Sequence, residues 1–164
     1  PNILLYPLLI SAATLELGSI VQHWDGIENA QNGVAQNAKI LMTPAAKTYL
    51  DMQYDSTTPF GLHWAAYIEL DSAYIWDPAT IVSGIYEDNI IGIEAPLWSE
   101  TIDKLDEIEY MAFPRIIGHA EIGWSPQKSR SWDEYKVRLA KHENRLREMG
   151  IDFYESAIIP RDSL

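Results

Sequence analysis

Apolar runs and a helical repeat alternate along the first part of the chain and predict a parallel α/β unit. Ser19–Trp24 (SIVQHW) and Lys39–Thr43 (KILMT) are short apolar runs of strand length, and Pro44 ends the second of them. Between them, residues 26–38 carry apolar side chains every three or four positions, which is the spacing of one helical face. A strand, a helix and a strand within about 25 residues form a βαβ unit, so the two strands should be parallel.

A third strand is expected over residues 89–95, where the β-branched sequence NIIGIEA precedes Pro96. Residues 44–88, which lead up to this strand, have no clear period and are rich in aromatic residues. Loops of this length inside a compact domain are usually functional or disordered, and the many aromatic residues argue against disorder. We therefore expect an ordered loop with a function.

Two helices are expected to close the chain. The first covers roughly residues 102–124 and should kink or restart near Pro114, because proline cannot donate the helical hydrogen bond. The second covers residues 131–149 and ends at Gly150. We expect His142, which lies on the apolar face of this helix, to be a packed core or boundary histidine. That face steps by three and four residues through Trp132, Tyr135, Leu139, His142, Leu146 and Met149.

Composition indicates ordinary globular structure. The 164 residues are 47% hydrophobic and 22% charged, without a repeat or a linker, so we expect residues 1–164 to form a single domain, with residues 1–10 not assigned a register. The net charge of −12 would repel phosphate backbones and anionic lipids, and neither nucleic acid nor a membrane is expected as a partner. A neutral ligand suits the chain better, and its six Trp and nine Tyr offer flat faces for one.

The ends and the cysteine content say little about the compartment. The chain has no cysteine, which excludes disulfides and thiolate metal sites. Its first ten residues (PNILLYPLLI) are apolar, but a membrane span takes about 20 residues and a signal peptide begins with a charged region. We therefore expect a soluble chain without a targeting segment. Because the chain begins with Pro rather than Met, it is expected to be a processed or excised piece.

Polar and aromatic residues gather where each predicted strand ends. The clusters are HWD (residues 23–25), TYLD (48–51) and LWSE (97–100). In parallel α/β folds, ligands bind beyond the carboxyl ends of the strands. A core strand needs neither the Trp98 ring nor the Glu100 carboxylate, and burying an unpaired carboxylate is costly. A sugar needs both, since it has an apolar C–H face and hydroxyl groups.

The order and spacing of these segments resemble the C-terminal part of the catalytic barrel of the family 20 glycoside hydrolases, the β-N-acetylhexosaminidases. The similarity covers about residues 11–155. It implies an α/β fold that is a partial (β/α)8 TIM barrel, roughly its last three to four βα units, with the three strands as the sixth to the eighth. The matching segments are SIVQHWDG, TYLDMQYD, AYIWDP, IIGIEAPLWSE, EYMAFPRIIGHAEIGWSP and the helix that follows, WDEY…RL.

The chain departs from the family in two places. The adjacent Asp–Glu pair that supplies the family's acid has no counterpart at a strand end, because the two Asp-Glu dipeptides here, at 106–107 and 133–134, lie in predicted helices. The Trp-acid-Glu strand end that the family has shortly before the position of Ser11 is also missing. The chain therefore resembles a barrel without its first half, and we expect a homo-oligomer or a complementing chain to complete it.

The resemblance also implies roles for five side chains. In this family the substrate's own acetamido oxygen attacks the anomeric carbon, so no protein nucleophile is needed. Tyr49 would donate to the acetamido carbonyl and orient it, and Trp24 would wall the acetamido methyl group. Trp98 would form the floor under the sugar ring, while Asp51 and Glu100 would accept hydrogen bonds from the 4- and 6-hydroxyls.

Other polar and aromatic residues receive lesser roles. Asp25, Tyr54 and Trp64 are expected at the rim of the sugar site. His23, His63 and His119 lack the paired spacing of a metal site, so no metal and no cofactor is expected. Structural roles are expected for Trp76 and Asp77. They are also expected for four residues of the long helix, on the outside of a barrel: Arg115, His119, Glu121 and Trp124.

Three functions remain open at this point. The chain could form part of an assembly that hydrolyses terminal β-linked N-acetylglucosamine or N-acetylgalactosamine. It could instead be a sugar-binding module or pseudoenzyme that lacks the acid. Finally, it could be a glycosidase that uses Asp51 and Glu100 as its own carboxylate pair, in which case the two groups should lie roughly 5–9.5 Å apart.

Overall fold

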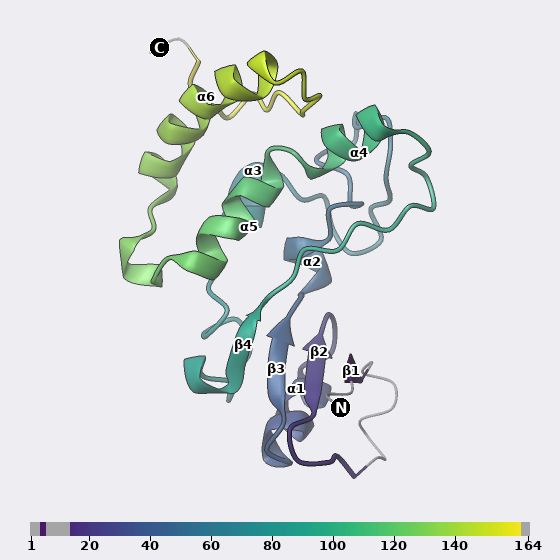
Figure 1. The fold of residues 1–164 in the computed structure, drawn as a ribbon, viewed down its shortest axis with the longest axis vertical. Helices are drawn as coiled ribbons and strands as arrows, with labels where there is room; N and C mark the ends of the chain where they lie inside the picture. Colours follow the sequence, from purple (N-terminus) through teal and green to yellow (C-terminus); the bar gives the residue numbers. More distant parts are fainter. Residues whose placement is uncertain (1–3, 6–13, 162–164) are drawn as a thin grey trace.

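The computed structural model describes residues 4–5 and 14–161, and at its centre is a parallel sheet of four strands. Strands β1 (Leu4–Leu5), β2 (Ile20–His23), β3 (Lys39–Met42) and β4 (Ile90–Ile93) lie side by side in that order (Figure 1). The three predicted strands are confirmed. Strand β1 falls among the first ten residues, for which no strand was predicted. All pairings are parallel, and the fold is α/β.

Helix α1 (Ile27–Ala35) connects β2 to β3 and confirms the predicted βαβ unit. The helix packs closely on the sheet because Gly33 has no side chain: a Cβ atom there would meet Val21 Cγ2 at 2.9 Å. The register places Ile20 opposite Lys39 and His23 opposite Met42. The two strands therefore end level with each other, and their following residues emerge at the same edge.

The long segment between β3 and β4 is ordered, as expected. It contains the short helices α2 (Ala45–Thr48) and α3 (Leu70–Tyr74) and the 3-10 turn η2 (Glu87–Asn89). In Figure 1 all the arrowheads of β2–β4 point to one end of the sheet, and α2 lies directly beyond them. This segment therefore covers the carboxyl ends of the strands.

The predicted helix over residues 102–124 is divided in two. Helix α4 (Leu105–Ala112) ends before Phe113, and α5 (Arg115–Trp124) begins directly after Pro114, which confirms the expected interruption. A 3-10 turn, η3 (Gln127–Ser129), then leads to α6 (Trp132–Glu148). The apolar face of α6 packs into the core through Tyr135, Leu139 and Leu146, whereas His142 is half-buried and Met149 is exposed.

The main core lies between the sheet and the helices that flank it. Val21, Ile40 and Met42 contribute from the strands, and the Tyr74 and Tyr135 rings stack at 4.1 Å between α3 and α6. A second, smaller core is formed within the long segment between β3 and β4 and contains Tyr49, Met52, Ile68 and Ala73 among others.

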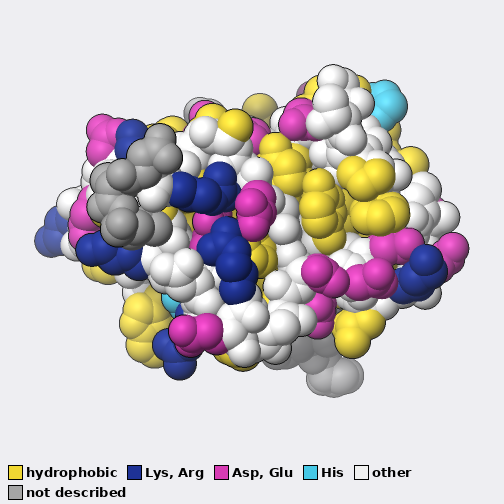
Figure 2. Space-filling view, turned by 90° about the horizontal axis from the view of Figure 1, so that it is seen from above, with side chains coloured by type: hydrophobic (Ala, Val, Ile, Leu, Met, Phe, Trp, Pro, Cys, Tyr) yellow, Lys and Arg dark blue, Asp and Glu magenta, His cyan; other side chains and the backbone are white. Residues whose placement is uncertain are grey.

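Charge is distributed unevenly on the surface. Seen from above, most Lys and Arg side chains lie on the left of the molecule, the side on which α6 lies, with acidic side chains among them, and a row of acidic side chains crosses the right (Figure 2). Among the described residues, none of the helices is long and apolar enough to cross a membrane.

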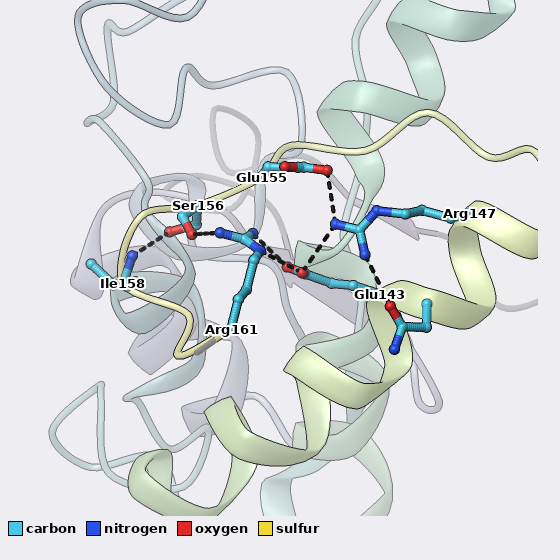
Figure 3. A network of polar contacts seen from close by, with 7 residues as sticks. Glu143, Arg147, Glu155, Ser156, Ile158 and Arg161 are labelled. Carbon is cyan, nitrogen blue, oxygen red and sulfur yellow. Dashed lines mark hydrogen bonds and ion pairs between the residues drawn. The ribbon is translucent and has the colours of Figure 1, made fainter. Parts of the chain in front are cut away.

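An ion-pair network centred on the buried Glu143 holds the C-terminal segment against α6 (Figure 3). Glu143 has no exposed surface, and its two carboxylate oxygens accept hydrogen bonds of 2.8 Å from the Arg161 guanidinium. Arg147 lies 3.7 Å from the same carboxylate and binds Glu155 at 2.8 Å. Arg161 also donates to the Ser156 carbonyl, so the segment after α6 is fixed by charged groups at several points.

Candidate functional site

Side chains that follow three neighbouring strands converge on one cavity of about 300 Å3 at the carboxyl edge of the sheet. Trp24 comes directly after β2, Tyr49 and Asp51 follow β3 by way of α2, and the segment after β4 supplies two more residues. One further aromatic residue comes from the long loop. The lining of the cavity consists of Trp24, Tyr49, Asp51, Trp64, Trp98 and Glu100.

The aromatic rings of the cavity form a connected cluster. The Tyr49 ring lies 6.4 Å from the Trp98 ring and 6.0 Å from the Trp64 ring, and Trp64 in turn lies 6.2 Å from Trp24. Tyr49 is buried, whereas Trp98 and Trp64 are 43% and 57% exposed. Large aromatic faces that remain exposed around a hollow are suited to covering the apolar face of a ligand.

Asp51 is the most constrained polar group of the cavity. Its side chain is 2% exposed, and Oδ1 has no hydrogen-bond partner among the described residues. Burial raises the pKa of Asp51 and nearby Glu100 raises it further, while backbone hydrogen bonds at Asp51 and Trp98 and the charge of Arg115 act in the opposite direction. Because a buried carboxylate oxygen without a partner is costly, its place at a cavity indicates a hydrogen-bond acceptor for a ligand.

The turn that carries Asp51 is held by backbone hydrogen bonds to neighbouring segments. The Leu50 N–H donates to the Pro96 carbonyl at 2.8 Å, and the Asp51 carbonyl accepts from the Leu62 N–H at 2.9 Å. Gly61 makes this approach possible, since its φ is +84° and a Cβ atom there would collide with the Asp51 carbonyl oxygen. The site is therefore built on a fixed backbone.

The predicted rim residues have different locations. Trp64 lines the cavity, as expected of a rim residue. Asp25 is exposed in the turn after β2 and is not part of the lining; its charge partly offsets the burial that lowers the pKa of His23. Tyr54 requires a correction: it lies in the core at 1% exposure, because its hydroxyl group reaches backbone carbonyls at the end of α4, among them that of Met111 at 3.0 Å.

Arg115, for which a structural role is expected, lies in the interior behind the site. Its side chain is 2% exposed, and its guanidinium donates to the Leu50 and Met52 carbonyls on either side of Asp51. Neighbouring His119 is 3% exposed without hydrogen-bond partners among the described residues, and burial, with a contribution from Arg115, lowers its pKa to about 3. Only the position of Arg115 after the Phe-Pro dipeptide of the family-like motif distinguishes it in the sequence.

A second cavity of about 660 Å3 lies beside the outer strand β4. Its lining includes the strand itself and the turn after α5, where Trp124 is 91% exposed. The carboxylate Asp77 in this lining is paired with Arg130 at 3.3 Å. The cavity therefore follows the open edge of the sheet and lies apart from the convergence of side chains described above.

Neither an Asp-Glu dipeptide at the cavity nor a cluster of metal ligands is present in the part of the chain that the structure describes. The Asp-Glu dipeptides at 106–107 and 133–134 lie in the first turns of α4 and α6, and neither lines the sugar-sized cavity. Within residues 14–161 there is no group of three His, Asp or Glu side chains that could hold a metal ion.

Comparison with known proteins agrees with the geometry of the site. The family model described as "Glycosyl hydrolase family 20, catalytic domain" matches residues 8–127. A β-N-acetylhexosaminidase of Cellulomonas fimi is 42% identical over 136 residues, which are 81% of this chain and 27% of that protein.

Solved structures give the same result. The GH20 β-N-acetylhexosaminidase of Streptomyces coelicolor superposes with a TM-score of 0.90 at 40% identity. A mutant β-hexosaminidase of Streptomyces plicatus in complex with the product GlcNAc superposes with a TM-score of 0.90 at 42% identity. In both cases the match covers 97% of this chain and 33% of the other, so this chain spans a third or less of the relatives named here.

Proposed function

The chain belongs to glycosyl hydrolase family 20, and on that premise we propose that it supplies the sugar-binding half of a β-N-acetylhexosaminidase. The proposed reaction is hydrolysis of terminal non-reducing β-linked N-acetylhexosamine by a substrate-assisted mechanism with retention of configuration. One observation carries this proposal: two Trp, one Tyr and two carboxylates that follow three successive strands line a single cavity, together with Trp64 from the long loop. The GlcNAc product named for the Streptomyces plicatus structure supports the substrate class.

Tyr49 has the central role in this mechanism. The acetamido oxygen of the substrate attacks the anomeric carbon, and a hydroxyl donor that fixes the acetamido group lowers the entropic part of the barrier. Tyr49 is a buried residue of the cavity lining, with the Trp64 ring edge-on at 6.0 Å and the Trp98 ring tilted at 6.4 Å. Its ring is therefore held firmly enough to aim a hydroxyl group.

The remaining lining residues bind the pyranose. Trp98 is proposed as the floor under the sugar ring and Trp24 as the wall beside the acetamido methyl group, with Trp64 at the rim. Asp51 and Glu100 accept hydrogen bonds from the 4- and 6-hydroxyls, and charged acceptors make such bonds stronger than neutral ones. The open Oδ1 atom of Asp51 supports this role. Asp25 remains proposed only for the outer rim.

We propose that residues 1–164 form one domain, the C-terminal part of a (β/α)8 barrel in which β2, β3 and β4 are the sixth to eighth strands. An eight-unit barrel usually takes about 250 residues, and an isolated part leaves open sheet edges that favour association. The cavity beside β4 is where a completing strand would lie. A second copy, a complementing chain or further sequence of the same protein would supply that strand.

A sugar-binding module without hydrolytic activity is the second candidate function. The two Asp-Glu dipeptides favour this function, because they lie in α4 and α6 and not in the cavity lining. By itself, this chain would then lack the acid that the family uses. A glycosidase that uses Asp51 and Glu100 as its own pair is a third candidate, since both carboxylates line the same cavity.

One assay separates the three functions. The purified chain, alone and within any assembly that completes the barrel, is incubated with an aryl N-acetyl-β-glucosaminide and with the matching aryl β-glucoside. Release from the N-acetyl compound alone supports the proposed reaction. Binding of GlcNAc without release supports the binding module, and equal release from both compounds supports an Asp51–Glu100 pair. A chain that neither binds nor cleaves under any of these conditions contradicts the proposal.

A further inference from the structure

Arg115, the first residue of α5, is buried directly behind the turn that carries Asp51. Its Nη1 donates to the Met52 carbonyl at 2.7 Å and is 3.3 Å from the Ile68 carbonyl. Its Nη2 donates to the Leu50 carbonyl at 2.6 Å and to the Met111 carbonyl at 2.8 Å. One guanidinium therefore joins the turn after β3, the part of the long loop just before α3 and the end of α4.

The two shortest of these bonds flank Asp51 in the chain. The Leu50 and Met52 carbonyl groups accept from the same planar fork, so the peptide group before Asp51 and the peptide group after Met52 are fixed from the core side. The Asp51 carbonyl, in the peptide group between them, is held by the Leu62 N–H at 2.9 Å. With three consecutive carbonyl groups engaged, the backbone that carries the Asp51 side chain is fixed.

The guanidinium itself has little freedom. Its carbon atom lies 3.8 Å from the centre of the Tyr54 ring, and Tyr54 stacks on Tyr154 at 3.9 Å. Arg115 donates only to backbone carbonyls, and no ion pair joins it to a carboxylate among the described residues. A buried cation without an ion-pair partner is costly, which calls for a role beyond packing.

We propose that Arg115 is a positioning residue of the sugar site: it holds the backbone on both sides of Asp51 so that the carboxylate points into the cavity toward the sugar hydroxyls. This inference rests on the proposed function. Arg115 does not line the cavity and touches no substrate, so it acts through Asp51. Lysine would keep the charge but not the planar fork that reaches both carbonyls.

A double-mutant cycle on GlcNAc binding, measured by calorimetry, tests this role. Arg115→Lys should weaken binding about tenfold, as expected for a disturbed hydrogen bond to a charged group. In an Asp51→Ala background the same substitution should change the affinity less than about twofold, because a residue that acts through Asp51 has no further effect once Asp51 is removed. A merely structural arginine would weaken binding equally in both backgrounds.

Arg130→Lys is the matched control. Arg130 is also buried, with its side chain 5% exposed, and it also donates to a backbone carbonyl, that of Trp76 at 3.0 Å, but it lies beside the second cavity. Its substitution should leave GlcNAc affinity unchanged. An equal loss in Arg115→Lys and Arg130→Lys, or additive losses in the cycle, would overturn the inference while leaving the proposed function intact. A wild-type chain that does not bind GlcNAc would instead overturn the proposed function, and this inference with it.

If Arg115→Lys does not fold, the wild-type protein provides the decisive measurement. Saturating GlcNAc should slow the exchange of the Arg115 guanidinium protons, observed by NMR, because the ligand stabilises the turn that they bind. The guanidinium protons of Arg130 should exchange at the same rate with and without the sugar. Identical behaviour of the two arginines would overturn the inference.

Discussion

Two buried carboxylates, Asp51 and Glu143, show how differently this chain treats a charge that it removes from water. Glu143 has no exposed surface, and both of its oxygens are bound by Arg161 with Arg147 nearby (Figure 3). Asp51 is 2% exposed, yet its Oδ1 has no partner among the described residues, and the nearby guanidinium of Arg115 binds backbone carbonyls instead. Both oxygens of Glu143 have hydrogen-bond partners, whereas Oδ1 of Asp51 has none among the described residues.

The difference indicates what each region is for. Burying a charge costs several kcal/mol unless hydrogen bonds and an opposite charge offset it, and the network around Glu143 offers both. Asp51 has neither in full, and its cavity has aromatic walls that are still exposed. The C-terminal network therefore stabilises the fold, whereas the open acceptor in the cavity supports our proposal of a ligand with hydroxyl groups.

The largest expected effect concerns turnover in the cavity. Tyr49→Phe removes the hydroxyl donor and keeps the ring, so in any assembly that cleaves substrate the turnover number should fall on the order of 10²–10³-fold. The free energy of unfolding should change by only about 1 kcal/mol. Steady-state kinetics with an aryl N-acetyl-β-glucosaminide and chemical denaturation measure the two quantities. Full activity in Tyr49→Phe would make this residue a structural tyrosine.

Neutralising Glu143, the fully hydrogen-bonded carboxylate, should lower stability. Glu143→Gln keeps the size of the side chain but loses the charge that Arg161 and Arg147 face, and the free energy of unfolding should fall by about 2 kcal/mol. This figure allows for the partial exposure of Arg161, whose side chain is 30% exposed. GlcNAc affinity should not change. Urea denaturation and calorimetric titration check both statements, and a stable Glu143→Gln variant would show that the network contributes little.

Neutralising the open carboxylate should have the opposite effect. Asp51→Asn is the matched substitution, and we expect GlcNAc affinity to fall about tenfold because a charged acceptor is replaced by a neutral one. Stability should stay the same or rise, since the raised pKa of Asp51 means that its ionised form is disfavoured in the folded protein. Marked destabilisation by Asp51→Asn would erase the contrast with Glu143.

The smallest expected effects are opposite responses to acid. The pKa of Asp51 is raised above its ordinary 3.8, first by burial, so as the pH falls this carboxylate becomes protonated before the pH reaches 3.8. Protonation removes the cost of a buried charge from the folded state, and it should weaken GlcNAc binding over the same pH range. The pKa of Glu155 is lowered below its ordinary 4.5, first by its bond to Arg147, so the stability it contributes is present above that ordinary value and is lost as the pH falls through the lowered one. NMR titration of both carboxyl carbons tests these directions, and an Asp51 that titrates below 3.8 would contradict the account.

The sequence was sufficient for the elements whose pattern is local. Strands β2, β3 and β4 and helix α1 follow from short apolar runs and a helical repeat, and the break at Pro114 follows from the missing N–H group. Because parallel strands end at one edge, the residues after them could be predicted to meet. Five of the residues that line the cavity follow these strands, and the resemblance assigns them to the sugar site; Trp64, from the long loop, is expected only at its rim.

The remaining features depend on contacts between distant segments. Tyr54 follows Asp51 by only three residues, but its hydroxyl group binds carbonyls 56 to 59 residues away, which places it in the core. Arg115 binds carbonyls 63 and 65 residues away. An arginine is usually at the surface of a protein, and no local sequence pattern indicates that the partners of Arg115 are backbone carbonyls of a distant loop.

Tryptophan fluorescence during titration with N-acetylglucosamine tests most directly whether the cavity binds the sugar. Trp98 is 43% exposed at the cavity, and a sugar ring placed on it should change its emission. The wild-type chain is expected to give a saturable change that Trp98→Ala abolishes, while substitution of the 91%-exposed Trp124, which lies at the other cavity, leaves the change intact. Equal responses in wild type and Trp98→Ala, or a response that disappears with Trp124→Ala instead, would contradict the account.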